Sequence, residues 1–513
     1  MNKGLLALVL AGIMTLAISS CSSEKPSGTV ATLEPLTRED VIQVNIPSHA
    51  SWPYQENWKV WEYIEEGCGA TLEITAIPST DAKSKYPLMF ASPDTLPDVM
   101  SFSTKLRCDQ YNEGGAIIAL DDMEEYMPNY NAWLDSLSKE EYAQYVTVRK
   151  AYDGKVYYTP AMGKESSSGV RAWLYRKDIF DKHNLSVPTT FEELYNVCKE
   201  LKKLYPDSYP YCLRSAFNHI DASGPSWKPY WSTGFYYDFN EEKWNYGASE
   251  DVMLEVIKFH KKMVEEKLMP SDFMTISDSA WKELITTDRG FIMPEYQTRI
   301  DFFNPLGRTT NPDYDLQAMI PPVAMEGGVA KMNRYTIDPN GMLMCNTGSE
   351  DRIANAAKFI DWFYTDEAKE LVSWGKEGET FEIVDGKKRF ITDEMQTQPN
   401  SLYGFSTYGT YNLLDEDATL ALESEDIAET RDMVLSHLHD EPMVNTWLAH
   451  GPAEKQAISE YATAISTYTQ EMVSKMILGQ EPISKFDEYV ATLNEMGLPE
   501  LLAAYETSYN NVK

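Results

Sequence analysis

The sequence lacks the spaced cysteines and histidines that metal and redox sites require. The chain has six cysteines and seven histidines in 513 residues. No Cys-x-x-Cys pair occurs, and neither does an HExxH, a GxSxG or a glycine-rich phosphate loop. We therefore expect a protein that holds no metal and no cofactor, and no catalytic motif is present in the sequence.

Positive charge is scarce as well. Lys and Arg number 45 against 79 Asp and Glu, which gives a formal net charge of −34. A chain this acidic repels phosphate backbones, so nucleic acid is excluded as a partner. With 79 acidic residues, the sequence cannot nominate the spaced carboxylate pair that glycoside hydrolysis needs. A glycan hydrolase therefore stays open as a less favoured alternative.

Long apolar runs are absent after the N-terminus. Lys3 and the apolar stretch from Leu5 to Ala17 predict a secretory signal peptide over residues 1–20. That stretch is shorter than the about 20 residues of a membrane-spanning helix. The following segment, ISSC at 18–21, resembles a bacterial lipobox, in which Cys21 becomes the lipid-modified N-terminus; an ordinary signal with an incidental cysteine is the alternative. Residues 21–38 have the composition of a flexible linker.

The remaining five cysteines are odd in number, so they cannot all pair. We expect buried small hydrophobes with at most one disulfide and leave the pairing open. The five are Cys68, Cys108, Cys198, Cys212 and Cys345. The segment 238–243 begins like a calcium loop but has Lys243 where an EF-hand requires glycine, so no calcium site is expected there.

The body alternates between strand and helix patterns. Val41–Ile46 and Thr71–Ile77 read as strands, and the helical spacing of Asn57–Gly67 lies between them. Further helices are predicted at Leu185–Leu204, with a capping box from Thr189 to Glu192, at Ile353–Leu371, and after Ile458. This alternation predicts an α/β fold with a largely parallel sheet.

Six segments, in order along the chain, are similar to motifs of one protein family. They are YPLMFASPDTLPD at 86–98, YNEGGAIIALD at 111–121, YDGKVYYTP at 152–160, LYRKD at 174–178, VPTTFEEL at 187–194, and KEGETF at 376–381 before Asp385. Together, after a lipobox, they make the chain resemble the family 1 extracellular solute-binding lipoproteins of ABC importers, in particular their long LipO-type branch.

The resemblance implies an α/β periplasmic-binding-protein-like fold with two lobes, a hinge and a central ligand cleft. The first lobe is expected at 39–157 with 320–374 and the second at 158–319 with 375–513, with crossings near 156–160, 317–322 and 374–378. It also implies a monomer, lipid-anchored through Cys21 on the outer face of the cytoplasmic membrane of a Gram-positive type cell. Such a protein captures an extracellular oligosaccharide and delivers it to the permease subunits without a catalytic step.

The stretch PSWKPYWSTGFYYDF at 225–239 is the richest in aromatic residues, with seven in fifteen positions. Trp227, Tyr230 and Trp231 are expected to stack on sugar faces, since an indole or phenol covers an apolar ring face while its polar edge meets water or a hydroxyl. Core packing is the alternative for all three. The alternation at 236–239 indicates a strand whose rings are core or support.

Further candidates follow from position in the family resemblance. They are Trp52 and Tyr54 after the first strand, Phe102 and Lys105 after LPDV, Tyr296, the loop residues Tyr403 and Tyr408, and Trp447. Arg171 and Arg299 could hold a uronate carboxylate, although a surface or structural role is preferred for both. The ligand's identity, length and linkage stay open, and a peptide or another small solute is the main alternative to an oligosaccharide.

Overall fold

Two β-sheets organise the body of the protein. The computed structural model describes residues 33–49, 52–101, 111–160, 170–214, 217–334, 341–393, 398–410, 412–444 and 448–512. Leu36–Lys513 form one compact unit, and Met1–Pro35 belong to a separate one. The signal peptide, Cys21, Phe102, Lys105, Cys108 and Trp447 lie outside the described residues. Among the described helices, none combines the length and apolarity needed to cross a membrane.

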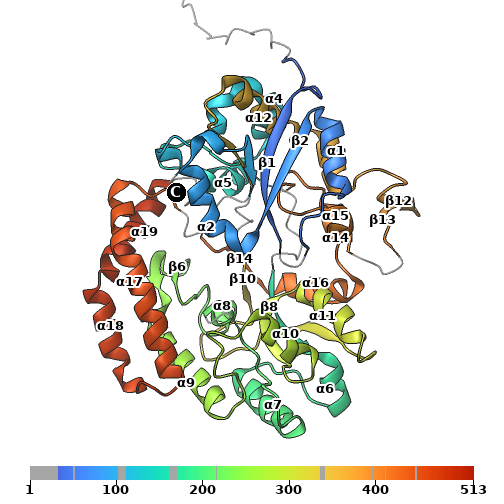
Figure 1. The fold of residues 1–513 in the computed structure, drawn as a ribbon. Coiled ribbons are helices and arrows are strands. Elements are labelled where there is room, and N and C mark those ends of the chain that lie inside the picture. Colours follow the sequence, from blue (N-terminus) through green and yellow to red (C-terminus); the bar gives the residue numbers. More distant parts are fainter. Residues whose placement is uncertain are drawn as a thin grey trace, which may run out of the picture. The chain divides into compact units, whose positions relative to one another are not determined.

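The first sheet has the strand order β2-β1-β3-β11-β4 (Figure 1). Its central strand β1 pairs in parallel with β2 and β3, and β11 runs antiparallel to β3 and β4. The strands are β1 (Val41–Ser48), β2 (Thr71–Pro78), β3 (Val99–Ser101), β4 (Ile117–Ile118) and β11 (Met342–Cys345). Ile42, Val44 and Ile46 of β1 are buried together with Val60 and Ile64 of the helix that follows, which explains why this segment folds as strand, helix, strand.

Helices cover this sheet and share its core. They are α1 (Lys59–Cys68), α2 (Ser79–Phe90), α4 (Pro128–Ser136), α5 (Lys139–Tyr145), α12 (Glu350–Trp362), α13 (Asp366–Ser373), α14 (Pro399–Tyr403) and α15 (Glu416–Ala421), with a hairpin of β12 (Phe381–Val384) and β13 (Lys387–Phe390). The single helix expected at Ile353–Leu371 is two helices. The break falls where the Thr365 side chain accepts the backbone N–H of Ala368 and caps α13.

The second sheet has the order β8-β5-β9 and is antiparallel throughout. Its strands are β5 (Arg171–Arg176), β8 (Ile292–Tyr296) and β9 (Leu316–Met319). The two-lobed α/β fold expected from the family resemblance is therefore present, but within these two sheets the parallel pairing is confined to β1, β2 and β3. A parallel pair needs a long crossover between strands, whereas β5 takes both partners in the opposite direction.

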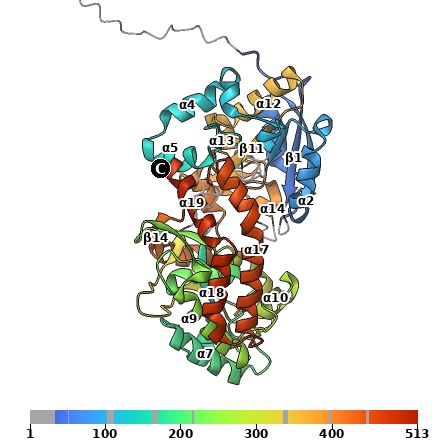
Figure 2. The ribbon, with the colours of Figure 1, turned by 90° about the vertical axis from the view of Figure 1, so that its left-hand side faces the viewer.

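The second sheet carries its own helices and small strand pairs. They are α6 (Lys177–His183), α7 (Phe191–Leu204), α8 (Phe217–Ala222), α9 (Asp251–Glu265), α10 (Asp278–Thr286), α11 (Arg299–Arg308), α16 (Glu425–Ser436), α17 (Pro452–Ile477), α18 (Phe486–Glu495) and α19 (Leu498–Val512), with β6 (Phe235–Asp238) beside β7 (Lys243–Tyr246) and β10 (Met332–Arg334) beside β14 (Leu438–Pro442). Helices α17, α18 and α19 lie side by side, and α17 packs on α9 (Figure 2). Helix α7 begins at Phe191, and its cap is Thr190, one position later than the expected Thr189. The hydroxyl of Thr190 accepts the backbone N–H of Glu193, while the backbone N–H of Thr189 donates to the Glu193 carboxylate.

The hydrophobic cores show where the chain passes from one sheet to the other. The first passage lies between Tyr158 and Ala172. The second lies between Met332 and Met342, later than the expected 317–322. The third lies between Ala418 and Ile427, whereas we expected it near 374–378.

The third boundary needs correction because of where three phenylalanines pack. Phe381, Phe390 and Phe405 join the core of the first sheet, and Phe390 stacks on Trp374 with 4.7 Å between ring centroids. The hairpin and loop after Trp374 therefore belong with the first lobe.

The cysteines are buried as small apolar side chains. Cys68, Cys198, Cys212 and Cys345 are free thiols, so the described residues contain no disulfide. Burial raises the pKa of the Cys68 thiol to about 11, which makes it unreactive at neutral pH.

Candidate ligand-binding site

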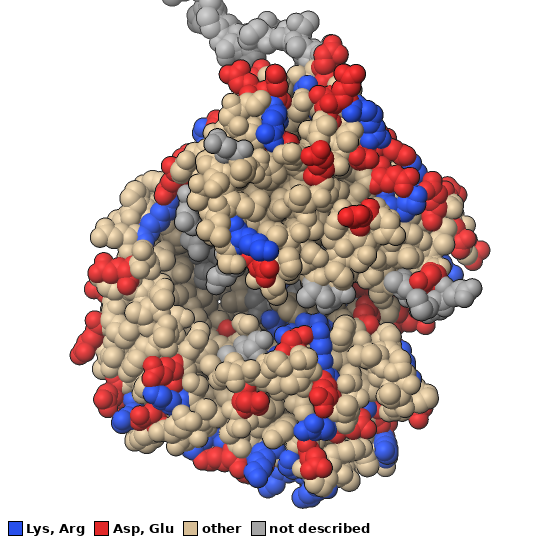
Figure 3. Space-filling view, viewed as in Figure 1, with Lys and Arg blue, Asp and Glu red and all other residues tan. Residues whose placement is uncertain are grey.

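The ends of the two sheets mark the candidate site. The parallel strands β1, β2 and β3 end at one edge of the first sheet, and β11 begins there, since Met342 pairs with Ser101. In the second sheet, β8 and β9 end where β5 begins, since Arg171 pairs with Tyr296 and Trp173 with Met319. The chain thus passes between these two edges, and the surface is hollowed between them (Figure 3). Ligands of α/β proteins bind beyond the carboxyl ends of strands.

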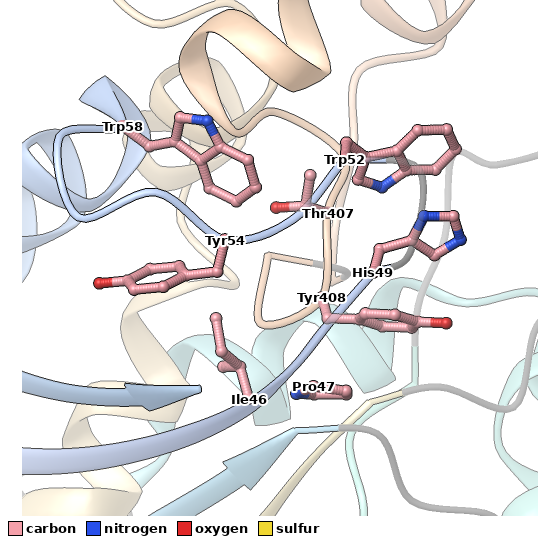
Figure 4. A pocket seen from close by; sticks show the side chains of 8 residues that line it. All are labelled: Ile46, Pro47, His49, Trp52, Tyr54, Trp58, Thr407 and Tyr408. Carbon is pink, nitrogen blue, oxygen red and sulfur yellow. The ribbon is translucent and has the colours of Figure 1, made fainter. Parts of the chain in front are cut away.

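A small aromatic pocket lies at the end of β1 (Figure 4). Its lining residues are Ile46, Pro47, His49, Trp52, Tyr54, Trp58, Thr407 and Tyr408. The space along these side chains is about 170 Å³ including open solvent, and none of it is enclosed enough to hold a water molecule, whereas pockets that engulf drug-sized ligands measure about 300–1,000 Å³. The pocket is therefore a shallow indentation, and a ligand can lie against its exposed ring faces but is not engulfed by it.

Three rings of the pocket form a column (Figure 4). His49 and Trp52 are stacked, with 4.0 Å between centroids and 13° between planes. The ring of Tyr408 follows at 5.9 Å from His49, tilted by 47°. Trp52 is half-buried, so the column offers a flat apolar surface with polar edges, as sugar recognition requires.

Backbone contacts fix the two loops that carry these rings. The backbone N–H of Tyr54 donates to the hydroxyl of Ser48 at 3.0 Å, and Trp58 Nε1 donates to the carbonyl of Ser401 at 2.7 Å. Gly409 has φ 91°, and a Cβ there would lie 2.7 Å from the indole of Trp61. Only glycine fits such a close approach with a positive φ. The loop is thereby held against the core with Tyr408 at the pocket.

A charged cluster lies at the end of the second sheet, around the fully buried carboxylate of Glu295. One oxygen accepts the backbone N–H of Tyr296 at 2.9 Å and faces Arg171 at 3.4 Å. The other accepts Arg214 Nη2 at 2.7 Å and His219 Nε2 at 3.1 Å. Burial alone would raise the pKa of Glu295, but the bond from His219 and the arginine charges lower it below its usual range.

The histidine in this cluster is neutral with a defined tautomer. Burial lowers the pKa of His219 despite the nearby Glu295. Its Nδ1 accepts the backbone N–H of Arg214 at 3.2 Å, so the hydrogen sits on Nε2 and is donated to Glu295. The cluster therefore holds the Arg171 guanidinium against the ring of Tyr296, with 4.0 Å from Cζ to the ring centroid.

The structure brings some of the predicted site residues to these two places. Trp52 and Tyr54 line the aromatic pocket, together with Tyr408, whereas Tyr403 lies outside it and donates its hydroxyl to the carbonyl of Ile391. Tyr296 ends β8 and is 37% exposed.

The exposure expected for two tryptophans is wrong. Trp227 is 4% exposed and packs edge-on against Phe191, and Trp231 is fully buried in the same core. Gly247 approaches the carbonyl of Ser232 and the Trp231 indole so closely that a Cβ would clash with both. The stretch 225–239 therefore passes through the interior and offers neither indole face to a ligand.

The third residue of that prediction, Tyr230, is half-buried in an unusual backbone conformation. It has φ 62°, and its ring stacks on His439 with 4.1 Å between centroids. Its hydroxyl donates to Glu441 at 2.7 Å. A non-glycine residue held at positive φ costs about 1–3 kcal/mol, and these two contacts offset that strain.

Several residues of the site were not predicted. His49, Trp58, Arg214, His219 and Glu295 were not selected. His49 lies next to Trp52 in a loop after a strand, so its position carried a signal. The members of the Glu295 cluster are up to 124 positions apart in sequence, and nothing local marks them.

Comparison with known proteins now places the chain. The family model described as "Bacterial extracellular solute-binding protein" matches residues 60–374. The chain belongs to this family. A curated relative of this solute-binding protein is an uncharacterised ABC transporter extracellular-binding protein of Pyrococcus horikoshii, 27% identical over 213 residues. The alignment covers 40% of the present chain and spans less than half, 45%, of that relative's length.

Solved structures match the solute-binding protein over nearly its whole length. The alginate-binding protein AlgQ2 without calcium ion has a TM-score of 0.74 at 21% identity, covering 94% of this chain and 99% of its own. An HMO-binding solute-binding protein from Bifidobacterium longum infantis matches with a TM-score of 0.72 at 17% sequence identity. The match covers 92% of this chain and 98% of that protein's chain. FusA of S. pneumoniae in complex with kestose matches with a TM-score of 0.70 at 19% sequence identity. The match covers 92% of this chain and 99% of the FusA chain. At these identities the likeness establishes the two-lobed fold.

Proposed function

We propose that this solute-binding protein captures an extracellular oligosaccharide between its two sheets and delivers it to the permease of an ABC importer. The observation that carries the proposal is the ring column of Trp52, His49 and Tyr408 at the end of β1. Aromatic faces with polar edges suit the apolar faces and hydroxyl rims of sugars. The printed names of the structural relatives, which bind alginate, HMO and kestose, support the same class of ligand.

The binding mechanism needs no chemical step. One sugar ring lies against the column, Tyr54 donates a hydrogen bond, and the rest of the ligand extends toward Tyr296 on the second sheet. Burial raises the pKa of Tyr54, with the charge of Glu56 adding to the effect, so its phenol stays protonated and able to donate. A ligand that contacts both sheets favours the closed arrangement, because only a difference in affinity shifts such an equilibrium.

The location belongs to the same proposal. The signal peptide and the lipobox at 18–21 support export and lipid attachment at Cys21 on the outer face of the cytoplasmic membrane. Replacement of Cys21 by Ala is expected to release the protein into the medium, as measured by fractionation of cells and culture supernatant. Retention of the variant in the membrane fraction would contradict the anchor.

The function is tested by thermal unfolding and calorimetry against a panel of oligosaccharides beside a peptide library. A ligand at a hundred times its Kd adds about 2.7 kcal/mol to stability. A shift with one class of glycan, unchanged glycan on chromatography, and loss of the shift in Trp52→Ala would support a binding protein. A shift with peptides alone would favour the peptide alternative. Release of shorter glycans would favour the hydrolase.

A further inference from the structure

Three arginines gather at the end of β8, on the edge of the second sheet. Arg171 begins β5, Arg299 begins α11, and Arg214 follows the bridge between Tyr211 and Ile292. Lys and Arg side chains gather at the lower rim of the hollow in the view of Figure 3. The chain as a whole has a net charge of −34, so this local concentration of positive charge is a candidate site for an anionic ligand.

Two of the three arginines hold the cluster together. Arg214 binds Glu295 through Nε at 3.0 Å and Nη2 at 2.7 Å, and faces Asp278 at 3.2 Å. Arg171 faces Glu295 at 3.4 Å and lies over the ring of Tyr296. Their side chains are 16% and 12% exposed, so both are fixed in place by interactions inside the protein.

Arg299 differs from both. Its Nε is buried without a hydrogen-bond partner among the described residues, and no ion pair joins its guanidinium to a carboxylate in that part of the chain. Burial lowers the pKa of Arg299, Glu295 raises it and Arg214 lowers it again. A buried charge without a paired anion is unfavourable, so an anion that reaches Arg299 gains an unusually strong partner.

Gln297 lies two positions before Arg299 and is also unsatisfied. It is fully buried, and its backbone N–H donates to the carbonyl of Val170 at 2.9 Å. Neither Nε2 nor Oε1 of its side chain has a partner among the described residues. Leaving a buried polar group unpaired costs about 1–3 kcal/mol. A donor and an acceptor are therefore left without a partner two positions before Arg299 in the chain.

The charge balance favours an anion. Arg171 and Arg214 share the carboxylate of Glu295, and the carboxylate of Asp278 faces both Arg214 and Lys282. With Arg299, which lies near both carboxylates, four positive side chains outnumber the carboxyls around them even when Asp221, near Arg171, is included. An anionic group of the ligand can offset the excess, and on an oligosaccharide a planar carboxylate also matches the forked donors of a guanidinium.

We propose that Arg299 and Gln297 recognise the carboxylate of an acidic sugar unit, so that the ligand is a uronate-containing oligosaccharide. The inference rests on the proposed function, since it names the class of oligosaccharide. Arg299 binds the carboxylate through the charged donors of its guanidinium. Gln297 bonds a neighbouring hydroxyl, and the exposed ring of Tyr296 covers the sugar face. Glu295 is a positioning residue that orients Arg171 and Arg214.

The test uses matched pairs of ligands and the purified protein. Uronate oligosaccharides of several linkages are compared by calorimetry with the same oligosaccharides after carboxyl reduction, which leaves the linkage and replaces each carboxylate by a neutral alcohol. We expect at least one uronate to bind tenfold or more tightly than its reduced form. In Arg299→Gln that ratio is expected to fall to about one, with the affinity for the reduced form changed less than twofold.

Two further variants separate ligand recognition from structure. Arg299→Lys keeps a charge but loses the forked donors, so it should retain part of the preference. Arg308→Gln removes the arginine at the other end of α11, which pairs with Asp426 at 2.7 Å, and should leave the preference intact. Unchanged melting temperatures in Arg299→Gln would exclude a purely structural role.

Each remaining outcome contradicts a different statement. Binding of neutral oligosaccharides without a preference for any uronate would overturn the inference and leave the proposed function standing. A preference that survives in Arg299→Gln would overturn the assignment to Arg299. Failure of every oligosaccharide, acidic and neutral, to bind would overturn the proposed function and the inference together.

Discussion

The imidazole of His49 lies parallel to the indole of Trp52, with 4.0 Å between their ring centroids. One face of the indole is covered by this stack, so under the proposed function we expect a ligand to meet Trp52 on the opposite face. The stack also fixes the orientation of the indole before any ligand arrives. A ring that is already oriented loses little conformational freedom on binding, which favours affinity.

Replacement of Trp52 by Ala is therefore expected to weaken oligosaccharide binding at least tenfold, or about 1.4 kcal/mol. The indole is half-buried in a loop, so the free energy of unfolding should change by less than about 1 kcal/mol. Calorimetry gives the affinity and urea unfolding the stability. The matched control is Trp133→Ala, another half-buried indole, which packs against Tyr130 and Tyr364. Trp133→Ala should lower stability and leave the affinity unchanged. If Trp133→Ala weakened binding and Trp52→Ala did not, the ring column would not belong to the binding site.

Replacement of Trp231 by Ala is expected to do the opposite. The side chain is fully buried, and loss of a buried tryptophan costs about 3–5 kcal/mol of folding stability. In urea unfolding the midpoint should fall strongly, while calorimetry on the protein that is still folded should give the wild-type Kd. A variant with full stability but no affinity would show that Trp231 contacts the ligand after all.

The contrast between these two tryptophans explains how far sequence reasoning reached. Both tryptophans lie in aromatic-rich segments flanked by loop residues. Amino-acid composition alone cannot distinguish a segment buried in the core from one that lines a cleft. Trp52 was placed by its position after the first strand, which is a topological argument. Trp231 was placed by composition, and the clash that a Cβ at Gly247 would meet shows the interior packing that the sequence could not.

The sequence predicted the secondary structure more accurately than it predicted the lobe boundaries. The strand expected at Thr71–Ile77 is β2, one residue longer, because alternation and β-branched residues are local signals. The boundary near Trp374 was wrong, since an apolar residue such as Phe405 does not state which of two cores it joins. The Glu295 cluster was missed for a related reason: its members meet only in the folded chain.

The buried His260 predicts how stability depends on pH. Burial lowers its pKa from the usual 6.5 to about 4, although its Nδ1 bonds the carbonyl of Val256. Between about pH 4 and pH 6.5, His260 is therefore protonated in the unfolded chain and neutral in the folded chain. Stability is complete above pH 6.5 and falls as the pH drops toward 4, by about 2 kcal/mol at pH 5.

His260→Leu removes this titration and provides the measurement. The difference in unfolding free energy between wild type and variant should shrink by about 2 kcal/mol from pH 7.5 to pH 5. Asp301 and His439 also have shifted pKa values, of about 6 and about 4. They are present in both proteins and cancel in the difference. A difference that is constant with pH would mean that the fold does not lower the pKa of His260.

Gly409 and Gly386 form a matched pair for the loop that carries Tyr408. Both have positive φ, at 91° and 78°. A Cβ at Gly409 would lie 2.7 Å from Trp61 and 2.9 Å from Ile46, whereas nothing lies within 4 Å of one at Gly386. Gly386→Ala should cost only the left-handed backbone, about 1–2 kcal/mol. Gly409→Ala adds overpacking of about 1–3 kcal/mol and moves Tyr408 away from His49.

The two alanine variants should therefore differ in kind as well as in degree. In urea unfolding both lose stability, Gly409→Ala more, and in calorimetry only Gly409→Ala should weaken oligosaccharide binding. A displacement of the Tyr408 ring by about 1 Å already forfeits a quarter to a half of a van der Waals contact, so a small shift of the loop is enough to weaken its contact with a ligand. Equal affinities in the two variants would show that the loop can move without consequence for the ligand, and Tyr408 would then line the pocket without contributing to binding.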